Sequence, residues 1–212
     1  MRAAFFDLDE TLIAMKSMFA FLEFYLARVD GDASSFTKVM SVVERSVARG
    51  ATRQDINSYY YSLYCGHRQT TVRRHAQKFF SSIQVRYNAT VVERLRAHQS
   101  CGDRTIVVSG AMQDIIFPVT DQLGIDHHLC TTPGVEGGRY TGRILKQAIG
   151  AGKAALVEDY CLSHQIDPRG CVAYGDHHSD RHMLNCVGLG VAVHPDVQMR
   201  ALAAQHQWEI IQ

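Results

Sequence analysis

Three carboxylates stand within four residues near the N-terminus, at Asp7, Asp9 and Glu10, directly after the apolar run 3–6. This run predicts a buried strand, and a strand of an open α/β sheet presents its carboxyl end to the ligand crevice. Two carboxylates this close repel each other unless a cation lies between them or one is protonated. A hard divalent ion such as Mg²⁺ accepts such ligands, and a metal-screened aspartate can attack phosphorus to form an aspartyl-phosphate. The alternative is a solvated surface turn, because a motif as short as D-x-D-x-T also arises by chance.

The composition is that of a globular protein of enzyme size. A chain of 212 residues with 46% hydrophobic content suffices for one core domain with a modest insertion. The net charge of +1, from 22 basic and 21 acidic residues, leaves no basic footprint for nucleic acid or an anionic membrane. Six scattered cysteines without a C-x-x-C pair favour reduced thiols. No apolar run reaches the roughly 20 residues of a membrane span, and the first strand begins at once. We therefore expect a cytoplasmic protein with neither a signal peptide nor nucleic-acid or membrane partners.

Residues 16–85 show recurrent helical periodicity, with no proline and no convincing strand alternation. The apolar spacing predicts four short helices, the third of which is capped by Thr52 with Asp55 as the weak partner in a capping box. Short helices inserted after a first strand predict a helical cap over the sheet. We therefore divide the chain into a Rossmann-like core, residues 1–15 and 86–212, and a helical cap, residues 16–85.

Strands and helices alternate in the rest of the chain. The buried run 105–108 leads into Ser109 and Gly110, and the run 171–174 leads through a glycine into Asp176. Each predicted strand therefore ends in residues that can contact a ligand, as the first one does.

Two extended runs, 128–131 and 140–144, flank the turn-rich segment 133–138 and predict a hairpin. The repeated alternation of strand and helix predicts an α/β fold. Its expected architecture is a doubly wound parallel (Rossmann-like) sheet with a small all-helical cap subdomain.

Four sequence pieces follow one another along the chain: D-L-D-E-T after the first strand, S-G after a second, a lysine at a helix start, and G-D-H-H-S-D after a later strand. In this order they resemble the haloacid dehalogenase superfamily, subfamily IB, and specifically its phosphatases similar to phosphoserine phosphatase. The resemblance covers nearly the whole chain. It implies a Mg²⁺-dependent phosphomonoesterase that acts on a small phosphorylated metabolite through an aspartyl-phosphate, as a monomer or homodimer.

The resemblance assigns the acidic residues. Asp7 matches the nucleophile, which also binds the metal. Asp9 matches the general acid and base, so we expect its pKa to be raised, and its backbone carbonyl is the expected second protein ligand of the metal. Asp176 matches the metal-binding acid of the last motif. Thr11 is expected to support the first loop by hydrogen bonding, its alternative being an ordinary turn residue.

The other motif residues match substrate-binding and supporting positions. The Ser109 hydroxyl and the Gly110 amide can both donate to a phosphoryl oxygen, the alternative being a simple turn. Lys153 matches the lysine that offsets the charge of the nucleophile and of the phosphoryl group. We favour it over Lys146 because it opens a helix after two glycines, near the positive end of the helix dipole. Asp180 matches the acid that holds metal-bound water or the lysine, and it can also cap the next helix.

The substrate is less well specified. Phosphoserine phosphatases usually carry a glutamate nine residues after the nucleophile, where it meets the substrate amine, but this chain has Lys16 there. We assign Lys16 to substrate binding, which disfavours phosphoserine and favours an anionic or hydroxyl-rich substrate. His177 and His178 fill variable positions, for which we expect a solvent-facing loop or substrate contact. Imidazole suits Zn²⁺ or Ni²⁺, but oxygen ligands dominate the site, so we expect Mg²⁺.

Aromatic residues in the third predicted helix line the cap pocket or, as is commoner at helical spacing, belong to the core. They are Tyr59, Tyr60, Tyr61 and Tyr64, with Arg53 nearby.

Two alternatives to a phosphatase are kept. A phosphotransferase or phosphomutase would pass the same aspartyl intermediate to an alcohol acceptor, and a non-catalytic binding protein would keep the fold without turnover. Dehalogenation is disfavoured because Asp9 and the acidic last motif suit phosphate and metal chemistry.

Overall fold

A parallel sheet forms the centre of the protein in a computed structural model, which describes residues 2–29, 31–32 and 34–212. Six strands lie in the order β3-β2-β1-β6-β7-β8, and every neighbouring pair is parallel. Their bounds are β1 Ala3–Phe6, β2 Arg104–Ser109, β3 His127–Cys130, β6 Val172–Gly175, β7 Leu189–Val193 and β8 Glu209–Ile211.

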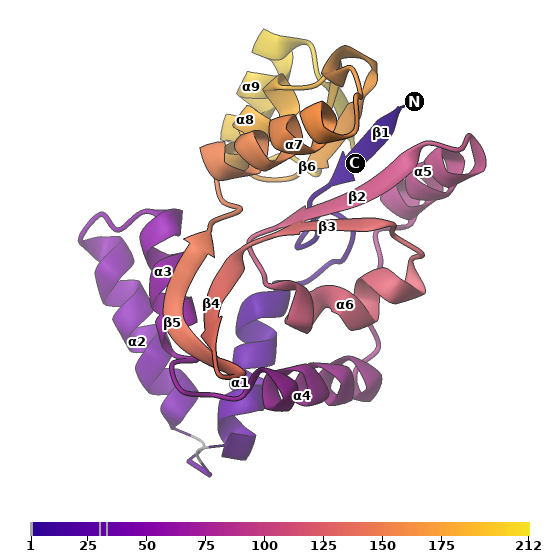
Figure 1. The fold of residues 1–212 in the computed structure, drawn as a ribbon. Coiled ribbons are helices and arrows are strands. Elements are labelled where there is room, and N and C mark those ends of the chain that lie inside the picture. The colour runs from indigo at the N-terminus through magenta and orange to yellow at the C-terminus, as the bar shows by residue number, and fades with distance from the viewer. Residues whose placement is uncertain (1, 30, 33) are drawn as a thin grey trace.

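Helices cover both faces of this sheet (Figure 1). Residues of α5 and α6 pack on the face to which Phe6 points, and residues of α7, α8 and α9 pack on the face of Phe5. Burial on both faces explains why β1 is a continuous apolar run without alternation. The predicted α/β fold with a parallel sheet is confirmed. The flanking helices are α5 Ala89–Ser100, α6 Gln113–Gln122, α7 Ala151–Ser163, α8 Arg181–Asn185 and α9 Val197–His206.

The strand order reverses beside β1, which lies between β2 and β6. In open α/β sheets the ligand crevice lies outside the carboxyl ends of the strands at such a reversal. Asp7 directly follows β1, Ser109 ends β2, and Asp176 directly follows β6. Because these strands are parallel, all three residues reach the same edge of the sheet.

The predicted cap helices are present between β1 and β2, and Figure 1 shows them grouped on one side of the molecule. The capping box at Thr52 is confirmed, since its hydroxyl accepts from the Asp55 amide at 3.2 Å and its own amide donates to the Asp55 carboxylate at 2.8 Å. One apolar cluster joins cap residues such as Phe21 to core residues such as Val107. The division into core and cap at residues 16 and 85 stays a prediction. The helices are α1 Ser17–Val29, α2 Ser35–Ala48, α3 Arg53–Ser62 and α4 Gln69–Ser82.

The predicted hairpin is wrong in its first strand. Most of the run 128–131 belongs to β3 in the main sheet, whereas the hairpin is formed by β4 (Thr132–Glu136) and β5 (Arg139–Lys146). The tight turn needs only Gly137 and Gly138, which have φ of 55° and 73°, so the residues before them remain extended. The hairpin also lies against the cap, because the Gly66 amide donates to the Tyr140 carbonyl at 2.8 Å.

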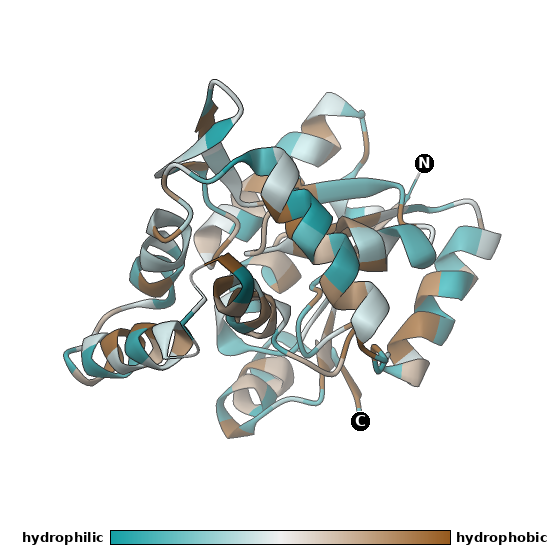
Figure 2. Cartoon of the chain, turned by 90° about the horizontal axis from the view of Figure 1, so that it is seen from below, coloured by the Kyte–Doolittle hydropathy of each residue, from teal (hydrophilic) through white to brown (hydrophobic). Residues whose placement is uncertain are grey.

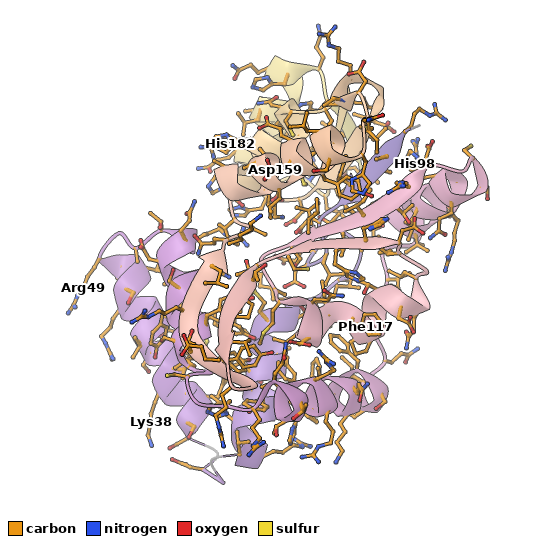
Figure 3. The ribbon with its side chains drawn as sticks, in the orientation of Figure 1. Lys38, Arg49, His98, Phe117, Asp159 and His182 are labelled. Carbon is orange, nitrogen blue, oxygen red and sulfur yellow. The ribbon has the colours of Figure 1, made fainter. Side chains whose placement is uncertain are left out.

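The surface helices are amphipathic, with hydrophilic and hydrophobic residues alternating along them (Figure 2). Lys38 on α2 and Arg49 just after it extend away from the rest of the molecule (Figure 3). Within the described residues, every helix falls short of the length and apolar character that crossing a bilayer would require.

Candidate active site

Lys153 forms two buried ion pairs at the centre of the crevice. Its Nζ lies 2.5 Å from Asp7 Oδ1 and 2.7 Å from Asp180 Oδ1. Only 4% of Lys153 and 2% of Asp180 are exposed. Burial disfavours the charged ammonium, but the charges of Asp180 and Asp7 outweigh this effect and raise the pKa of Lys153. Lys153 therefore remains a cation that orients the Asp7 carboxylate.

Three carboxylates gather beside this lysine. Single oxygens of Asp7, Asp176 and Asp180 all lie within 4.8 Å of one another. Burial, followed by the charges of Asp7 and Asp180, raises the pKa of Asp176 to about 8, and burial also raises the pKa of Asp7 despite Lys153. Thr11 bridges the first and last motifs, because its hydroxyl donates to Asp176 at 3.1 Å and to Asp7 at 3.4 Å.

This donor set fits a hard divalent cation. Its ligand atoms are carboxylate oxygens, which Mg²⁺ prefers, and three acids with one lysine leave negative charge that a bound cation would offset. From the sequence, Asp7, Asp9 and Asp176 are the expected metal ligands. The cluster contains Asp7 and Asp176, and its third member is Asp180. Participation of the Asp9 carbonyl stays a prediction.

Asp9 has a different environment from Asp7. Its Oδ2 accepts from the Ser17 amide at 2.9 Å, at the start of α1, whereas its Oδ1 is buried with no hydrogen-bond partner among the described residues. Burial raises the pKa of Asp9 to about 7, outweighing the hydrogen bonds from Ser17 that lower it. A carboxyl group that is half protonated near neutral pH suits a group that both donates and accepts a proton.

The second motif, Ser109 and Gly110, is held by hydrogen bonds from the cap helix α3. The Gly110 carbonyl accepts two buried hydrogen bonds from α3, at 3.1 Å from Asn57 Nδ2 and at 2.9 Å from the Tyr61 hydroxyl. Gln147 in turn donates to Asn57 Oδ1 at 3.1 Å. Ser109 Oγ accepts from the Ala111 amide at 3.1 Å, so its hydroxyl proton can be donated elsewhere.

A small cavity of about 40 Å³ joins these motifs. Its lining includes the predicted catalytic residues Asp7, Asp9 and Lys153 together with Ser109 and Gly110. The structure therefore brings the strand-end residues Asp7 and Ser109 into one space, and a carboxylate oxygen of Asp176 lies within 4.8 Å of one of Asp7. Lys146, the rival of Lys153, is exposed on β5.

Lys16 and His177 lie outside the inner cavity but line a larger one beside it. The Lys16 ammonium lies 3.5 Å from the Glu10 carboxylate, and 69% of the lysine side chain is exposed. His177 Nδ1 accepts from the Ser179 amide at 3.1 Å. Burial, followed by the charges of Arg53 and His178, lowers the pKa of His177 to about 4, so this imidazole is neutral at pH 7.

Comparison with known proteins identifies the family to which this chain belongs. The model of the haloacid dehalogenase-like hydrolase family matches residues 4–185, which include every motif described above. The chain belongs to this family. The resemblance to the haloacid dehalogenase superfamily that the sequence motifs indicated is confirmed. The predicted enzyme class is also confirmed, a hydrolase of the haloacid dehalogenase type with phosphatases among its relatives.

Relatives of this haloacid dehalogenase-like hydrolase align over most of its length. A probable phosphatase of Mycobacterium tuberculosis is 29% identical over 99% of this chain and 74% of its own. A phosphoserine phosphatase of Albidiferax ferrireducens is 27% identical over 93% of this chain and 81% of its own. The crystal structure of a protein of unknown function from Bordetella pertussis Tohama I has a TM-score of 0.89 at 24% identity, covering 100% of this chain and 98% of that one. This last likeness shows a shared fold.

Asn57 and Gln147 have no assigned role in the sequence analysis of this hydrolase. Asn57 is 4% exposed, and it lies on α3 one turn before Tyr61, with which it shares the Gly110 carbonyl. The sequence offered one signal for Asn57, a polar residue on an otherwise apolar helix face. A buried amide at such a position needs hydrogen-bond partners.

Proposed function

We propose that this hydrolase is a Mg²⁺-dependent phosphatase that releases phosphate from a small phosphorylated metabolite through a phosphoryl-enzyme formed on Asp7. The observation that supports this most is the pairing of two unlike aspartates in one cavity. Asp7 is fixed by the Lys153 ammonium, whereas Asp9 keeps a buried carboxyl oxygen without a hydrogen-bond partner in the described part of the chain. The first suits a nucleophile and the second suits a proton carrier.

In the first half-reaction the Asp7 carboxylate forms an O–P bond while the bond from phosphorus to the ester oxygen breaks. Asp9, protonated at the start, donates its proton to the departing ester oxygen. The Ser109 hydroxyl and the Gly110 amide donate to phosphoryl oxygens, and the Lys153 ammonium offsets the added negative charge. The hydrogen bonds from Asn57 and Tyr61 hold the Gly110 carbonyl, which belongs to the peptide that follows the Gly110 amide.

In the second half-reaction the roles reverse. Asp9, now ionised, accepts a proton from water as the water oxygen attacks phosphorus. The bond between phosphorus and the Asp7 oxygen breaks, which releases inorganic phosphate and restores the Asp7 carboxylate. The raised pKa of Asp9, about 7, allows both protonation states near neutral pH.

The Mg²⁺ ion would be held by Asp7 and Asp176, with Asp180 beside them and the Asp9 carbonyl as the further predicted ligand. When bound, it would supply electrostatic stabilisation of the phosphoryl oxygens and of the ionised carboxylates.

The test is phosphate release from p-nitrophenyl phosphate by the wild type and by Asp7→Asn. We expect Mg²⁺-dependent release that EDTA stops and that is absent in Asp7→Asn, because an amide is not a nucleophile of this kind. Mass spectrometry of acid-quenched wild-type enzyme should find a phosphoryl adduct on the peptide that carries Asp7.

The matched control is Asp159→Asn, on the outer surface of α7 (Figure 3). This variant also replaces one carboxylate by an amide, at a residue that does not line the cavity, and should keep full activity. Turnover by Asp7→Asn, or turnover in excess EDTA, would contradict the proposal. Phosphate that appears on an added alcohol instead of in solution would favour the phosphotransferase alternative.

A further inference from the structure

A second, larger cavity adjoins the catalytic one under the cap. Its volume is about 520 Å³, within the range typical of small-molecule sites. Met18, Arg53 and Ile149 line both cavities, so the two are contiguous. Under the proposed function, an ester whose phosphoryl group lies at Asp7 would place its leaving group here.

The wall of this second cavity is mainly apolar. Phe19 and Tyr60 form one part of it, with ring centroids 5.8 Å apart in an edge-to-face arrangement. Aliphatic side chains complete the wall, contributed by Met18, Val47, Ala51, Ile56 and Ile149. A surface of this kind gains free energy by covering an apolar group and gains little by covering a charged one.

Polar groups in the wall are already engaged inside the protein. Asn57 bonds to Gly110 and accepts from Gln147. The Tyr60 hydroxyl bonds to the Met18 carbonyl at 3.1 Å and to the Tyr64 hydroxyl at 2.8 Å. These groups offer few unused positions for the hydroxyls of a polyol.

Charged groups in the wall do not suit an amino-acid leaving group. Among the described residues that line this cavity, Glu10 alone carries a carboxylate, and its oxygen lies 3.5 Å from the Lys16 ammonium. Arg53 and His177 complete the polar lining. A guanidinium has no acceptor for an ammonium, and His177 Nδ1 already accepts from the Ser179 amide at 3.1 Å. The ammonium of a zwitterion would therefore have to share the Glu10 carboxylate with Lys16.

We propose that the preferred substrate is a phosphate monoester of an apolar alkyl or aryl alcohol, whose hydrocarbon part occupies the second cavity. This inference rests on the proposed function and specifies its substrate class. It departs from the anionic or hydroxyl-rich substrate expected from Lys16, because that ammonium lies 3.5 Å from the Glu10 carboxylate and 69% of the lysine side chain is exposed. The apolar wall supplies affinity through burial, and Ile56, Val47 and Phe19 are the specificity-determining residues. O-phosphoserine is a poor substrate because its ammonium would lose water against the apolar wall and would compete with Lys16 for Glu10.

The test compares kcat/KM for methyl, butyl and hexyl phosphate and for O-phosphoserine, with Mg²⁺ present. Each methylene that becomes buried should raise kcat/KM roughly fourfold until the cavity is filled. Hexyl phosphate should therefore exceed methyl phosphate by more than about 100-fold, and O-phosphoserine should fall below butyl phosphate.

Val47→Asp is the principal variant, because Val47 lines the cavity and yet is 56% exposed, so the fold should tolerate the change. We expect the hexyl-to-methyl ratio of kcat/KM to fall at least about tenfold, since a charge at the wall opposes burial of the chain. Ile56→Asn, deeper in the wall, should lower the same ratio. The matched control is Leu162→Asp on α7, 82% exposed and outside both cavities, which should leave the ratio unchanged.

A flat response to chain length, or a preference for O-phosphoserine, would overturn the inference while leaving a phosphatase in place. An equal loss of the ratio in Leu162→Asp would also overturn it. If no ester, p-nitrophenyl phosphate included, releases phosphate with Mg²⁺, the proposed function fails and this inference fails with it.

Discussion

Replacing Lys153 with methionine isolates the electrostatic role of the buried lysine. Methionine approximates the length of the side chain and removes its charge, which leaves Asp7 and Asp180 facing each other without a cation. The two ion pairs involve side chains that are 10% exposed or less, so solvent cannot replace the lysine. Removing one partner from such a buried network costs about 3–5 kcal/mol, which matches the sum of two charge-assisted hydrogen bonds at about 1.5–3 kcal/mol each.

The assay is urea unfolding followed by circular dichroism, in EDTA, at pH 7 and pH 5. The unpaired carboxyls of the variant will have raised pKa values in the folded state. A carboxyl of this kind destabilises the fold as pH rises, so the variant should recover part of its loss at pH 5. Mg²⁺ should stabilise the variant more than the wild type, because the ion supplies the missing positive charge. Lys146→Met is the matched control, because Lys146 is an exposed lysine at the end of β5. A loss below about 1 kcal/mol at pH 7, similar to that of the control, would refute the reasoning.

Two further predictions concern the other carboxyls. Burial raises the pKa of Asp176 to about 8 and of Asp9 to about 7, so the unfolding free energy in EDTA should decrease as pH rises from about 4 towards 8. Saturating Mg²⁺ should remove most of this decrease, and parallel pH profiles with and without the ion would contradict the metal assignment. Asp9→Asn should lower kcat/KM by about 10²–10⁴-fold for butyl phosphate and by less for p-nitrophenyl phosphate, whose leaving group needs no proton. Equal losses on both esters would argue against Asp9 as the acid.

Strand ends explain why so much of the candidate site could be predicted. Asp7, Ser109 and Asp176 each stand directly beside a short apolar run, and parallel strands necessarily bring such ends to one edge. The preference for Lys153 over Lys146 also had a local basis, because Gly150 with a φ of 57° precedes the helix that carries Lys153. In the structure Lys153 contacts Asp7, whereas Lys146 is exposed at the end of β5.

Contacts between the cap and the core had no comparable local signal. Asn57 reaches Gly110 across 53 positions of the chain and Gln147 across 90, and the spacing of neither residue encodes its partner. The prediction of the hairpin was wrong for a related reason. The extended run 128–131 and the glycines at 137–138 are local features, but only the edge of β2 decides that the run joins the main sheet.

Helix α3 links recognition of the leaving group to the phosphate-binding loop. Arg53, Ile56 and Tyr60 follow one another at spacings of three and four along α3, so they share the face that lines the second cavity. Asn57, which also lines that cavity, and Tyr61 each follow one position after Ile56 and Tyr60, and both donate to the Gly110 carbonyl. A leaving group that fills the second cavity therefore contacts α3, the same helix that holds the Gly110 carbonyl. For that reason substitutions in the wall should change kcat as well as KM, and a substrate too small to reach the wall forgoes part of the positioning that α3 provides.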